Sequence, residues 1–405
     1  MRILSSSSQS AGEQRQPASG AEPTFRLRDA ERAVVAQGVR AEVEPGAIDS
    51  FAERVCTFFA AHADGPRVIV GALPFDRSQA DYLFQPETLV RVEGQVETLP
   101  AAAAVLEAPR CVIRPEPAPS AYRDAVAACL ELIKRSAADV EPLTKVVLSR
   151  SLSLSSSHAF DAAGLLRALG QDRSVTVFST LLPGERSGPQ PLLVGATPEL
   201  LVSKRGANVI SHPLAGSARR YSDAAADRRS AAALESSEKD RREHQAVVDA
   251  VFDALSPYCR ELAAPKGTTL RPTASMWHLG TRIVGTLKDS ETPVTELAAV
   301  LHPTPAVCGL PRRRAAEVIG ELEGYDRGFY AGAVGWTDEQ GDGEWYVSIR
   351  SARIAGAQAT LYAGAGIVAG SDPVAETDET SAKFVALLSA LGIDEQGRPL
   401  RERAA

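Results

Sequence analysis

Two pairs of acidic residues have a spacing that could bind a metal ion. Asp240 and Glu243 lie three residues apart, just before a helical stripe of apolar residues at Val247, Val248 and Val251. Residues three apart face the same side of a helix, so both carboxylates are expected to point toward the interior. The pattern therefore predicts two inward-facing acids near the start of one helix.

A second pair, Glu376 and Glu379, repeats this spacing near the far end of the chain, ahead of Phe384, Leu387 and Leu388. Two helices that each offer two carboxylates could form an oxygen-lined site for a hard divalent cation. Alternatively, both pairs are solvated helix N-termini, where the helix dipole favours acids. The spacing alone leaves both interpretations open.

Two further ionisable residues lie within apolar strand patterns. Residues 144–154 alternate with a period of two, which puts Lys145 on the polar face at the start of a strand. Glu199 follows a Thr-Pro pair between two apolar strands, where desolvation would raise the pKa of its carboxyl. A turn-capping acid would explain Glu199 equally well.

Two glycine-containing segments could contact a ligand. Residues 214–220 form a small-residue loop with two arginines, whose backbone N–H groups could bind an anion, although a plain turn explains it as well. The segment 364–366 lacks the third glycine of a dinucleotide fingerprint, and its glycines would instead let a ligand approach the backbone.

Composition excludes several classes of protein. The 405 residues carry 44 Lys and Arg against 51 Asp and Glu, and a net charge of −7 argues against nucleic acid or an anionic membrane as partner. The five cysteines have no CxxC spacing and indicate neither a disulfide framework nor a zinc site, which fits a reducing cytoplasm. No apolar run approaches the length of a membrane span. Residues 1–24 are expected to form a disordered tail.

The spacing of apolar residues predicts the helices and strands that must position these side chains. Helices are expected over 46–61, 121–137, 160–169 and 312–322, and strands over 67–73, 144–154 and 175–182 and on both sides of Thr197-Pro198. A segment at 276–279 precedes a further strand. Residues 329–336, 345–354 and 359–368 predict three strands of an antiparallel meander, joined by tight turns.

Nine short motifs then occur in a fixed order: Lys-Val-Val-Leu-Ser-Arg (145–150), Ala-Thr-Pro-Glu-Leu-Leu (196–201), Pro-Leu-Ala-Gly-Ser-Ala-Arg-Arg (213–220), Ser-Glu-Lys-Asp-Arg-Arg-Glu-His (237–244), Trp-His-Leu (277–279), His-Pro-Thr-Pro-Ala (302–306), Ser-Ile-Arg (348–350), Ala-Gly-Ala-Gly-Ile-Val (363–368) and Glu-Thr-Asp-Glu-Thr (376–380). Together they closely resemble the chorismate-utilising enzymes and, within them, the isochorismate synthases of the catecholate siderophore branch.

The resemblance implies an α/β (α+β) fold: one large domain with extensive antiparallel sheet flanked by helices and an active site in a central cleft. It divides the chain into the tail (1–24), an N-terminal part of the fold (25–119), a chorismate-binding catalytic region (120–393) and a polar C-terminal tail (394–405). It also implies that the enzyme uses Mg²⁺ and binds chorismate. We further expect a cytoplasmic monomer.

Site residues follow from the resemblance position by position. Glu243 and Glu379 match the metal ligands, supported by Asp240 and Glu376. Lys145 matches the base that activates water for attack at C2, and Glu199 the acid that protonates the departing C4 hydroxyl. These roles require a lowered lysine pKa and a raised glutamate pKa, and burial favours both. Further matches to the substrate site are Gly216, Ser217, His278, Ala306, Tyr330, Ile349, Arg350, Gly364 and Lys383.

Several other functions remain open. A salicylate synthase would form isochorismate and then eliminate pyruvate. An anthranilate or aminodeoxychorismate synthase subunit would use ammonia, but a lysine at 145 suits water, and Ala306 stands where those relatives carry threonine. A catalytically inactive homologue could bind chorismate as a regulator, although every acid, base and metal position is filled.

Overall fold

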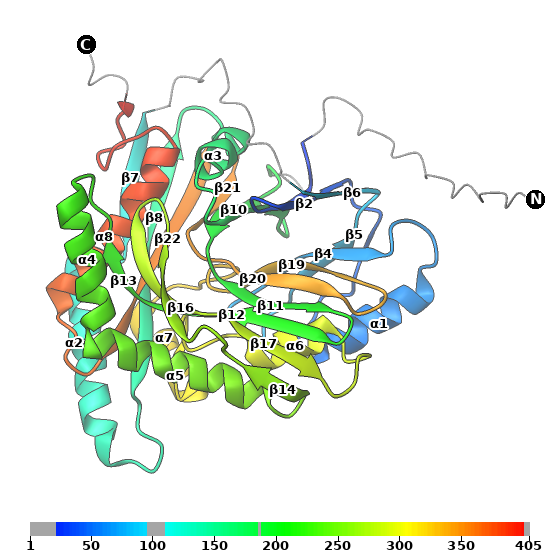
Figure 1. The fold of residues 1–405 in the computed structure, drawn as a ribbon. Coiled ribbons are helices and arrows are strands. Elements are labelled where there is room, and N and C mark those ends of the chain that lie inside the picture. Colours follow the sequence, from blue (N-terminus) through cyan, green and yellow to red (C-terminus); the bar gives the residue numbers. More distant parts are fainter. Residues whose placement is uncertain (1–21, 95–109, 185–187, 401–405) are drawn as a thin grey trace, which may run out of the picture.

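The computed structural model describes residues 22–94, 110–184 and 188–400. The expected disordered tail therefore lies outside the described residues up to residue 21, as does the end of the C-terminal tail from residue 401. Most of the Pro and Ala rich stretch before residue 110 is also outside them. Within the described part, three antiparallel sheets and eight α-helices form the molecule (Figure 1).

The largest sheet has ten strands. In spatial order they are β18 (Gly309–Leu310), β8 (Lys145–Ser156), β22 (Gln358–Val368), β21 (Ser351–Ala355), β10 (Leu192–Thr197), β9 (Thr176–Leu181), β1 (Phe25–Arg28), β2 (Arg32–Gln37) and β6 (Thr88–Glu93), with β7 (Cys111–Glu116) also paired to β8.

The second sheet has nine strands, and a third has three. The second runs β14 (Cys259–Ala263), β17 (Ile283–Leu287), β12 (Asn208–His212), β11 (Leu200–Arg205), β20 (Gly343–Val347), β19 (Ala333–Asp338), β4 (Val68–Leu73), β5 (Tyr82–Gln85) and β3 (Ala41–Glu42). The third runs β13 (Leu214–Arg219), β16 (Met276–Thr281) and β15 (Thr268–Pro272).

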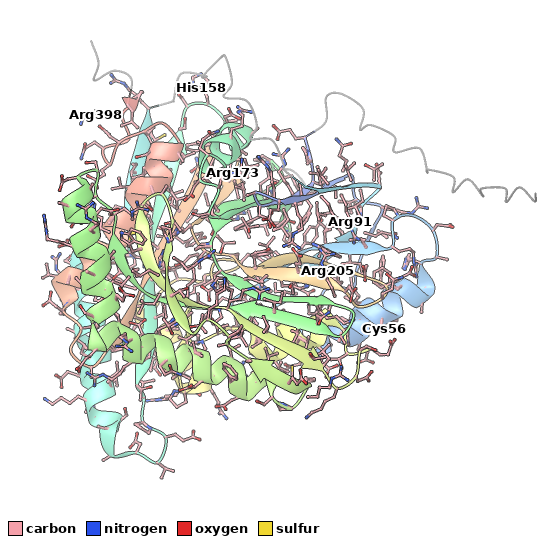
Figure 2. The ribbon with its side chains drawn as sticks, in the orientation of Figure 1. Cys56, Arg91, His158, Arg173, Arg205 and Arg398 are labelled. Carbon is pink, nitrogen blue, oxygen red and sulfur yellow. The ribbon has the colours of Figure 1, made fainter. Side chains whose placement is uncertain are left out.

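Helices flank the sheets. They are α1 (Phe51–Ala61), α2 (Pro119–Arg135), α3 (Ala162–Leu169), α4 (Ala224–Ser236), α5 (Glu238–Leu255), α6 (Val294–Leu301), α7 (Arg312–Glu323) and α8 (Pro373–Ala390). Helices α2 and α7 pack on β8, α8 packs on β22, and α4 and α5 pack on β13 and β16. In Figure 1, α2 and α8 stand on one side of the molecule and α1 on the opposite side. The exposed Cys56 of α1 lies at that outer edge (Figure 2).

Apolar side chains from both large sheets pack against each other. Phe25 and Phe178 of the ten-stranded sheet and Phe84 and Trp336 of the nine-stranded sheet belong to one buried cluster. Burial of such side chains supplies much of the free energy of folding. None of the helices described is long and apolar enough to cross a membrane. The predicted architecture of antiparallel sheets flanked by helices in one large domain is confirmed.

Most expected elements form close to their predicted bounds, but three expectations were wrong. The predicted three-stranded meander is instead two antiparallel hairpins, β19–β20 and β21–β22, because the chain leaves the nine-stranded sheet after β20 and enters the ten-stranded sheet as β21. The small-residue segment 214–220 is not a loop but mainly strand β13, and 276–279 lies within β16 rather than before a strand. Pairing of β13 with β16 explains both, because two short distant segments complete each other's backbone hydrogen bonds.

Candidate active site

A cleft opens where the two large sheets, the three-stranded sheet and helices α5 and α8 meet. It encloses about 990 Å³ of empty space, including the part that is open to solvent. Every residue predicted for the site except Lys145 lines it: Glu199, Gly216, Ser217, Asp240, Glu243, His278, Ala306, Tyr330, Ile349, Arg350, Gly364, Glu376, Glu379 and Lys383.

Glu199 reaches the cleft because the chain changes sheets there. Strand β10 ends at Thr197 in the ten-stranded sheet, and β11 begins at Leu200 in the nine-stranded sheet. The Glu199 side chain is 2% exposed, and burial raises the pKa of its carboxyl to about 8, against smaller opposing effects from Lys145 and the Leu214 backbone. Its Oε1 atom has no hydrogen-bond partner among the described residues. At neutral pH this acid is therefore protonated and has an oxygen available to a ligand.

Arg350 lies at a second change of sheet. Residues 348–350 connect β20 to β21, and Arg350 adopts the left-handed conformation with φ of 49°. Backbone hydrogen bonds join these two crossings, the segments where the chain passes from one sheet to the other. The Val347 N–H donates to the Glu199 carbonyl at 3.1 Å, and the Ala196 N–H donates to the Arg350 carbonyl at 3.2 Å. This is why the meander predicted from periodicity is interrupted where the guanidinium enters the cleft.

His278 of β16 supports the Arg350 side chain. The guanidinium Nη2 donates a short hydrogen bond to His278 Nε2. Burial, and then the charge of Arg350, lower the pKa of His278 well below its usual range, so the imidazole is neutral and accepts this bond. Burial also lowers the pKa of Arg350 to about 10, so the guanidinium remains charged at neutral pH. A neutral partner leaves the positive charge available for an anionic ligand.

The two predicted acid pairs form the opposite side of the cleft. Ser237 caps α5 by accepting from the Asp240 N–H at 3.2 Å, and Asp372 caps α8 by accepting from Ala375 N–H at 2.8 Å. These caps fix where the helices begin, and with them the positions of Asp240 and Glu376. All four carboxylates line the cleft, so they are not plain solvated helix termini.

Three of these carboxylates contact lysines. Lys145 Nζ lies 2.7 Å from Glu243 Oε1, Lys239 Nζ 3.3 Å from Glu376 Oε1, and Lys383 Nζ 2.7 Å from Glu379 Oε1. Lys145 is buried behind the wall of the cleft rather than lining it, so its polar strand face points to buried charged groups and not to water. Lys383 also donates to the Gly364 carbonyl at 2.8 Å, which ties α8 to β22.

The electrostatics of this side reflect crowded negative charge. Burial raises the pKa of Asp240, and the nearby Glu243 and Glu379 raise it further. Burial likewise raises the pKa of Glu376, as does Glu379. Burial opposes ionisation of Glu379 as well, but the Lys383 ammonium and a 3.0 Å hydrogen bond from the Ser217 hydroxyl outweigh it and lower its pKa.

This donor set fits a hard divalent cation. The side chains of α5 and α8 that line the cleft include four carboxylates that repel one another, a repulsion that a cation would relieve. Among the described residues no three such side chains converge as a preformed metal cluster. Mg²⁺ does not need one, because it binds to one or two carboxylates and completes its shell with water and substrate.

Glycines give the charged groups their space. A side chain on Gly366 would place its Cβ 2.7 Å from Glu243 Oε1 and 3.2 Å from Lys145 Cε. Gly216, with φ of 76°, sits at a register shift in β13, and a Cβ there would lie 3.1 Å from that of Asp240. Gly366 therefore makes room for an ion pair rather than directly for a ligand.

The cleft residues that sequence reasoning missed include Lys239, Tyr362 and Gly366. Lys239 stands four residues before Glu243 on α5, the spacing of a helical ion pair, which could have drawn attention to it. Tyr362, Gly364 and Gly366 alternate along β22, so the period of two predicts that they share one face. Tyr362 stacks on Tyr330 with ring centres 4.9 Å apart.

Comparison with known proteins agrees with this geometry. A family model described as "Chorismate binding enzyme" matches residues 82–392. Isochorismate synthase DhbC of Bacillus subtilis (strain 168) is 45% identical over 329 residues, 81% of each chain. Isochorismate synthase EntC of Escherichia coli (strain K12) is 37% identical over 348 residues, 85% of this chain and 86% of EntC.

Two solved structures share the fold. The crystal structure of DhbC from Bacillus anthracis superposes with a TM-score of 0.85 at 41% identity, covering 92% of this chain and 97% of that one. MenF, the menaquinone-specific isochorismate synthase from Escherichia coli, superposes with a TM-score of 0.76 at 26% identity, covering 91% and 89%.

Proposed function

Because this chain belongs to the family of chorismate-binding enzymes, we propose that it is an isochorismate synthase, an isomerase that converts chorismate to isochorismate. The observation that carries the proposal is Glu199: a buried carboxyl, protonated at neutral pH, with an oxygen that has no partner among the described residues. Such a group is suited to donate a proton to a leaving hydroxyl.

The reaction needs an acid and a base acting on one ring. The neutral amine of Lys145, once released from its contact with Glu243 and turned toward the cleft, takes a proton from a water molecule whose oxygen attacks C2. The ring double bonds shift, the C4–O bond breaks, and Glu199 gives its proton to the departing hydroxyl, so one water enters and one leaves. Lys145 lies near enough to Glu199 to affect the pKa of its carboxyl, and this proximity supports their action on the same substrate.

Binding of chorismate uses the charges around the cleft. We assign the side-chain carboxylate of the substrate to Arg350, held by His278, because a guanidinium matches a planar anion. Tyr330 and Tyr362 supply an aromatic wall. Gly216, Ser217, Ile349, Gly364 and Lys383 complete the substrate contacts.

We propose that Glu243 and Glu379 hold Mg²⁺, supported by Asp240 and Glu376. When bound, the ion would supply positive charge to the ring carboxylate of chorismate and help to orient it. The metal would then replace Lys145 as the cation on Glu243, which leaves the Lys145 amine available as base, while Lys383 would remain beside Glu379.

The product is proposed to be isochorismate rather than salicylate. Ala306 lines the cleft, where the larger threonine of the eliminating relatives would restrict the enolpyruvyl chain. A methyl group leaves space and removes a hydroxyl donor, so the ring is held less firmly for loss of pyruvate. We further propose a monomeric cytoplasmic enzyme that supplies 2,3-dihydroxybenzoate siderophore synthesis, on the basis of its similarity to DhbC and to a vibriobactin-specific isochorismate synthase of Vibrio cholerae.

One assay tests the proposal. The purified protein is incubated with chorismate and Mg²⁺ near neutral pH, and isochorismate, salicylate and pyruvate are resolved and followed over time. We expect isochorismate to accumulate without stoichiometric pyruvate. Salicylate and pyruvate formed as fast as chorismate is lost would identify a salicylate synthase, and binding without turnover would identify an inactive homologue.

A further inference from the structure

A buried ion pair behind the cleft occupies a gap in the ten-stranded sheet. Strand β8 is paired along one edge with β22 from Lys145 to Ser155. On its other edge, β18 pairs only with Lys145 and Val146, and β7 pairs only from Ser151 onward. Residues 147–150 therefore have no strand partner on that edge among the described residues, although the Val147 N–H still donates to the Cys308 carbonyl at 2.8 Å.

Arg327 and Glu323 fill this gap. Arg327 Nη2 donates to the Val147 carbonyl at 2.6 Å, and Glu323 Oε1 accepts from the Ser149 N–H at 2.6 Å. The two side chains also contact each other, with Nη2 and Oε1 2.5 Å apart, and each side chain is 2% exposed. Donor and acceptor thus replace the backbone groups that an adjacent strand would offer.

The same guanidinium reaches a second wall of the cleft. Its Nη1 donates to the Val307 carbonyl at 2.9 Å, and its face covers the Phe75 ring at 4.2 Å. Both Val147 and Val307 line the cleft. Val147 belongs to β8, the strand that carries Lys145, and Val307 follows Ala306. The Arg327 side chain does not line the cleft, so any influence on a ligand passes through these two segments.

We propose that Arg327 is a positioning residue, which together with the backbone bonds of β18 and Cys308 holds β8 and the segment 302–308 at a fixed spacing and thereby adjusts the fit of the substrate. The guanidinium donates to Val147, Val307 and Glu323 from three separate nitrogens, whereas a lysine keeps the charge but carries all its donors on one atom and cannot reach these acceptors in the same geometry. The catalytic consequence of this inference rests on the proposed use of chorismate, whereas the backbone positioning does not.

The test compares Arg327→Lys with Arg54→Lys. Arg54 is a matched control because it also bonds several backbone carbonyls and an acid, Asp81, that is 1% exposed, but contacts no residue of the cleft. Thermal unfolding and far-ultraviolet circular dichroism establish that each variant is folded. A double variant, Arg327→Met with Glu323→Leu, removes both buried charges and so avoids leaving one of them unpaired.

We expect amide hydrogen exchange to quicken at residues 145–149 and 302–308 in both Arg327 variants and not in Arg54→Lys. For chorismate, KM should rise and kcat/KM fall, by up to about 10²-fold, as displaced walls hold the substrate less well. A variant that is merely less stable loses active molecules but keeps the wild-type KM.

Unchanged exchange in these segments, or faster exchange with an unchanged KM, would overturn the positioning role. If the wild-type protein does not convert chorismate, the proposed function fails. In that case the exchange comparison alone decides whether Arg327 positions the two segments, so the two failures are distinguishable.

Discussion

The two sides of the cleft are built differently. Glu199 and Arg350 come from points where the chain passes between sheets, and backbone hydrogen bonds between these crossings fix them. The carboxylates of α5 and α8 come from helix starts, and lysine side chains rather than backbone groups pair with three of them. The strand side thus presents groups in fixed positions, while the helix side presents charges whose partners can be exchanged.

This difference suits two kinds of task. An acid must already be protonated and in place when the substrate arrives, which burial at a rigid crossing provides. A cation site must accept an ion from water, which side-chain ion pairs permit because long side chains can reorient. Variants on each side can therefore show whether the strand side supplies the acid and the helix side binds the cation.

The largest effect is expected on the helix side. Glu243→Gln or Glu379→Gln should abolish turnover, because each removes a charged oxygen ligand from a hard cation, and excess chelator should do the same to the wild type. The control Glu238→Gln makes the same change on the same helix at a side chain that is 89% exposed, and should keep full activity. Full turnover in excess chelator would show that the reaction does not require Mg²⁺.

On the strand side, Glu199→Gln and Lys145→Ala should each lower kcat by about 10²- to 10⁴-fold, the usual contribution of a placed acid or base. Unlike variants of the metal ligands, Glu199→Gln should retain binding of Mg²⁺, measured by calorimetry, if Glu199 acts only as acid. Lys204→Ala is the control for Lys145→Ala, since it also removes a buried lysine, 2.9 Å from Asp342, and should affect stability but not kcat. Wild-type rates in Glu199→Gln would show that the acid is misassigned.

The loss of activity at alkaline pH should report Glu199, on the strand side. Glu199 has a pKa raised to about 8 by burial, and only its protonated form can act as acid. Activity should therefore be retained below this value and be lost as the pH rises through about 8. The residual activity of Glu199→Gln should lack this decrease; a decrease that persists there belongs to another group.

The smallest effect is expected where the two sides touch. Gly366→Ala would push its Cβ against Glu243 Oε1 and Lys145 Cε, but side-chain ends can move aside. We expect kcat/KM to fall by less than about 10²-fold, with little change in thermal unfolding. In Gly320→Ala the added methyl group would meet no atom within 4 Å, so that variant should keep wild-type kinetics.

The helix side could be predicted from the sequence to a greater extent than the strand side. Spacing of three residues ahead of an apolar stripe suffices to place Asp240 with Glu243, and Glu376 with Glu379, because the helix is a local structure. That the two helices face one cleft came only from the resemblance, since spacing left solvated termini as an alternative.

The strand side depends on contacts between distant residues. Periodicity suggested one continuous strand over 345–354, whereas Arg350 interrupts it and the halves pair in different sheets. The partners of Arg327 lie 20 and 180 residues away, at Val307 and Val147, so no local pattern could reveal them. Sequence order shows which residues are present; which strand is adjacent to which is decided by the packing of the whole chain.

The pairing of β8 with β22 also bears on how the protein is made. Lys145 pairs with Val368 and Ser155 with Gln358, so the partner of the base strand is synthesised more than two hundred residues later. At about 5–20 residues per second, a ribosome takes on the order of tens of seconds to cover that distance. Throughout that time this edge of β8 must remain without its native neighbour. A nascent chain is therefore expected to need protection from aggregation during this interval, and to acquire catalytic competence only when synthesis is nearly complete.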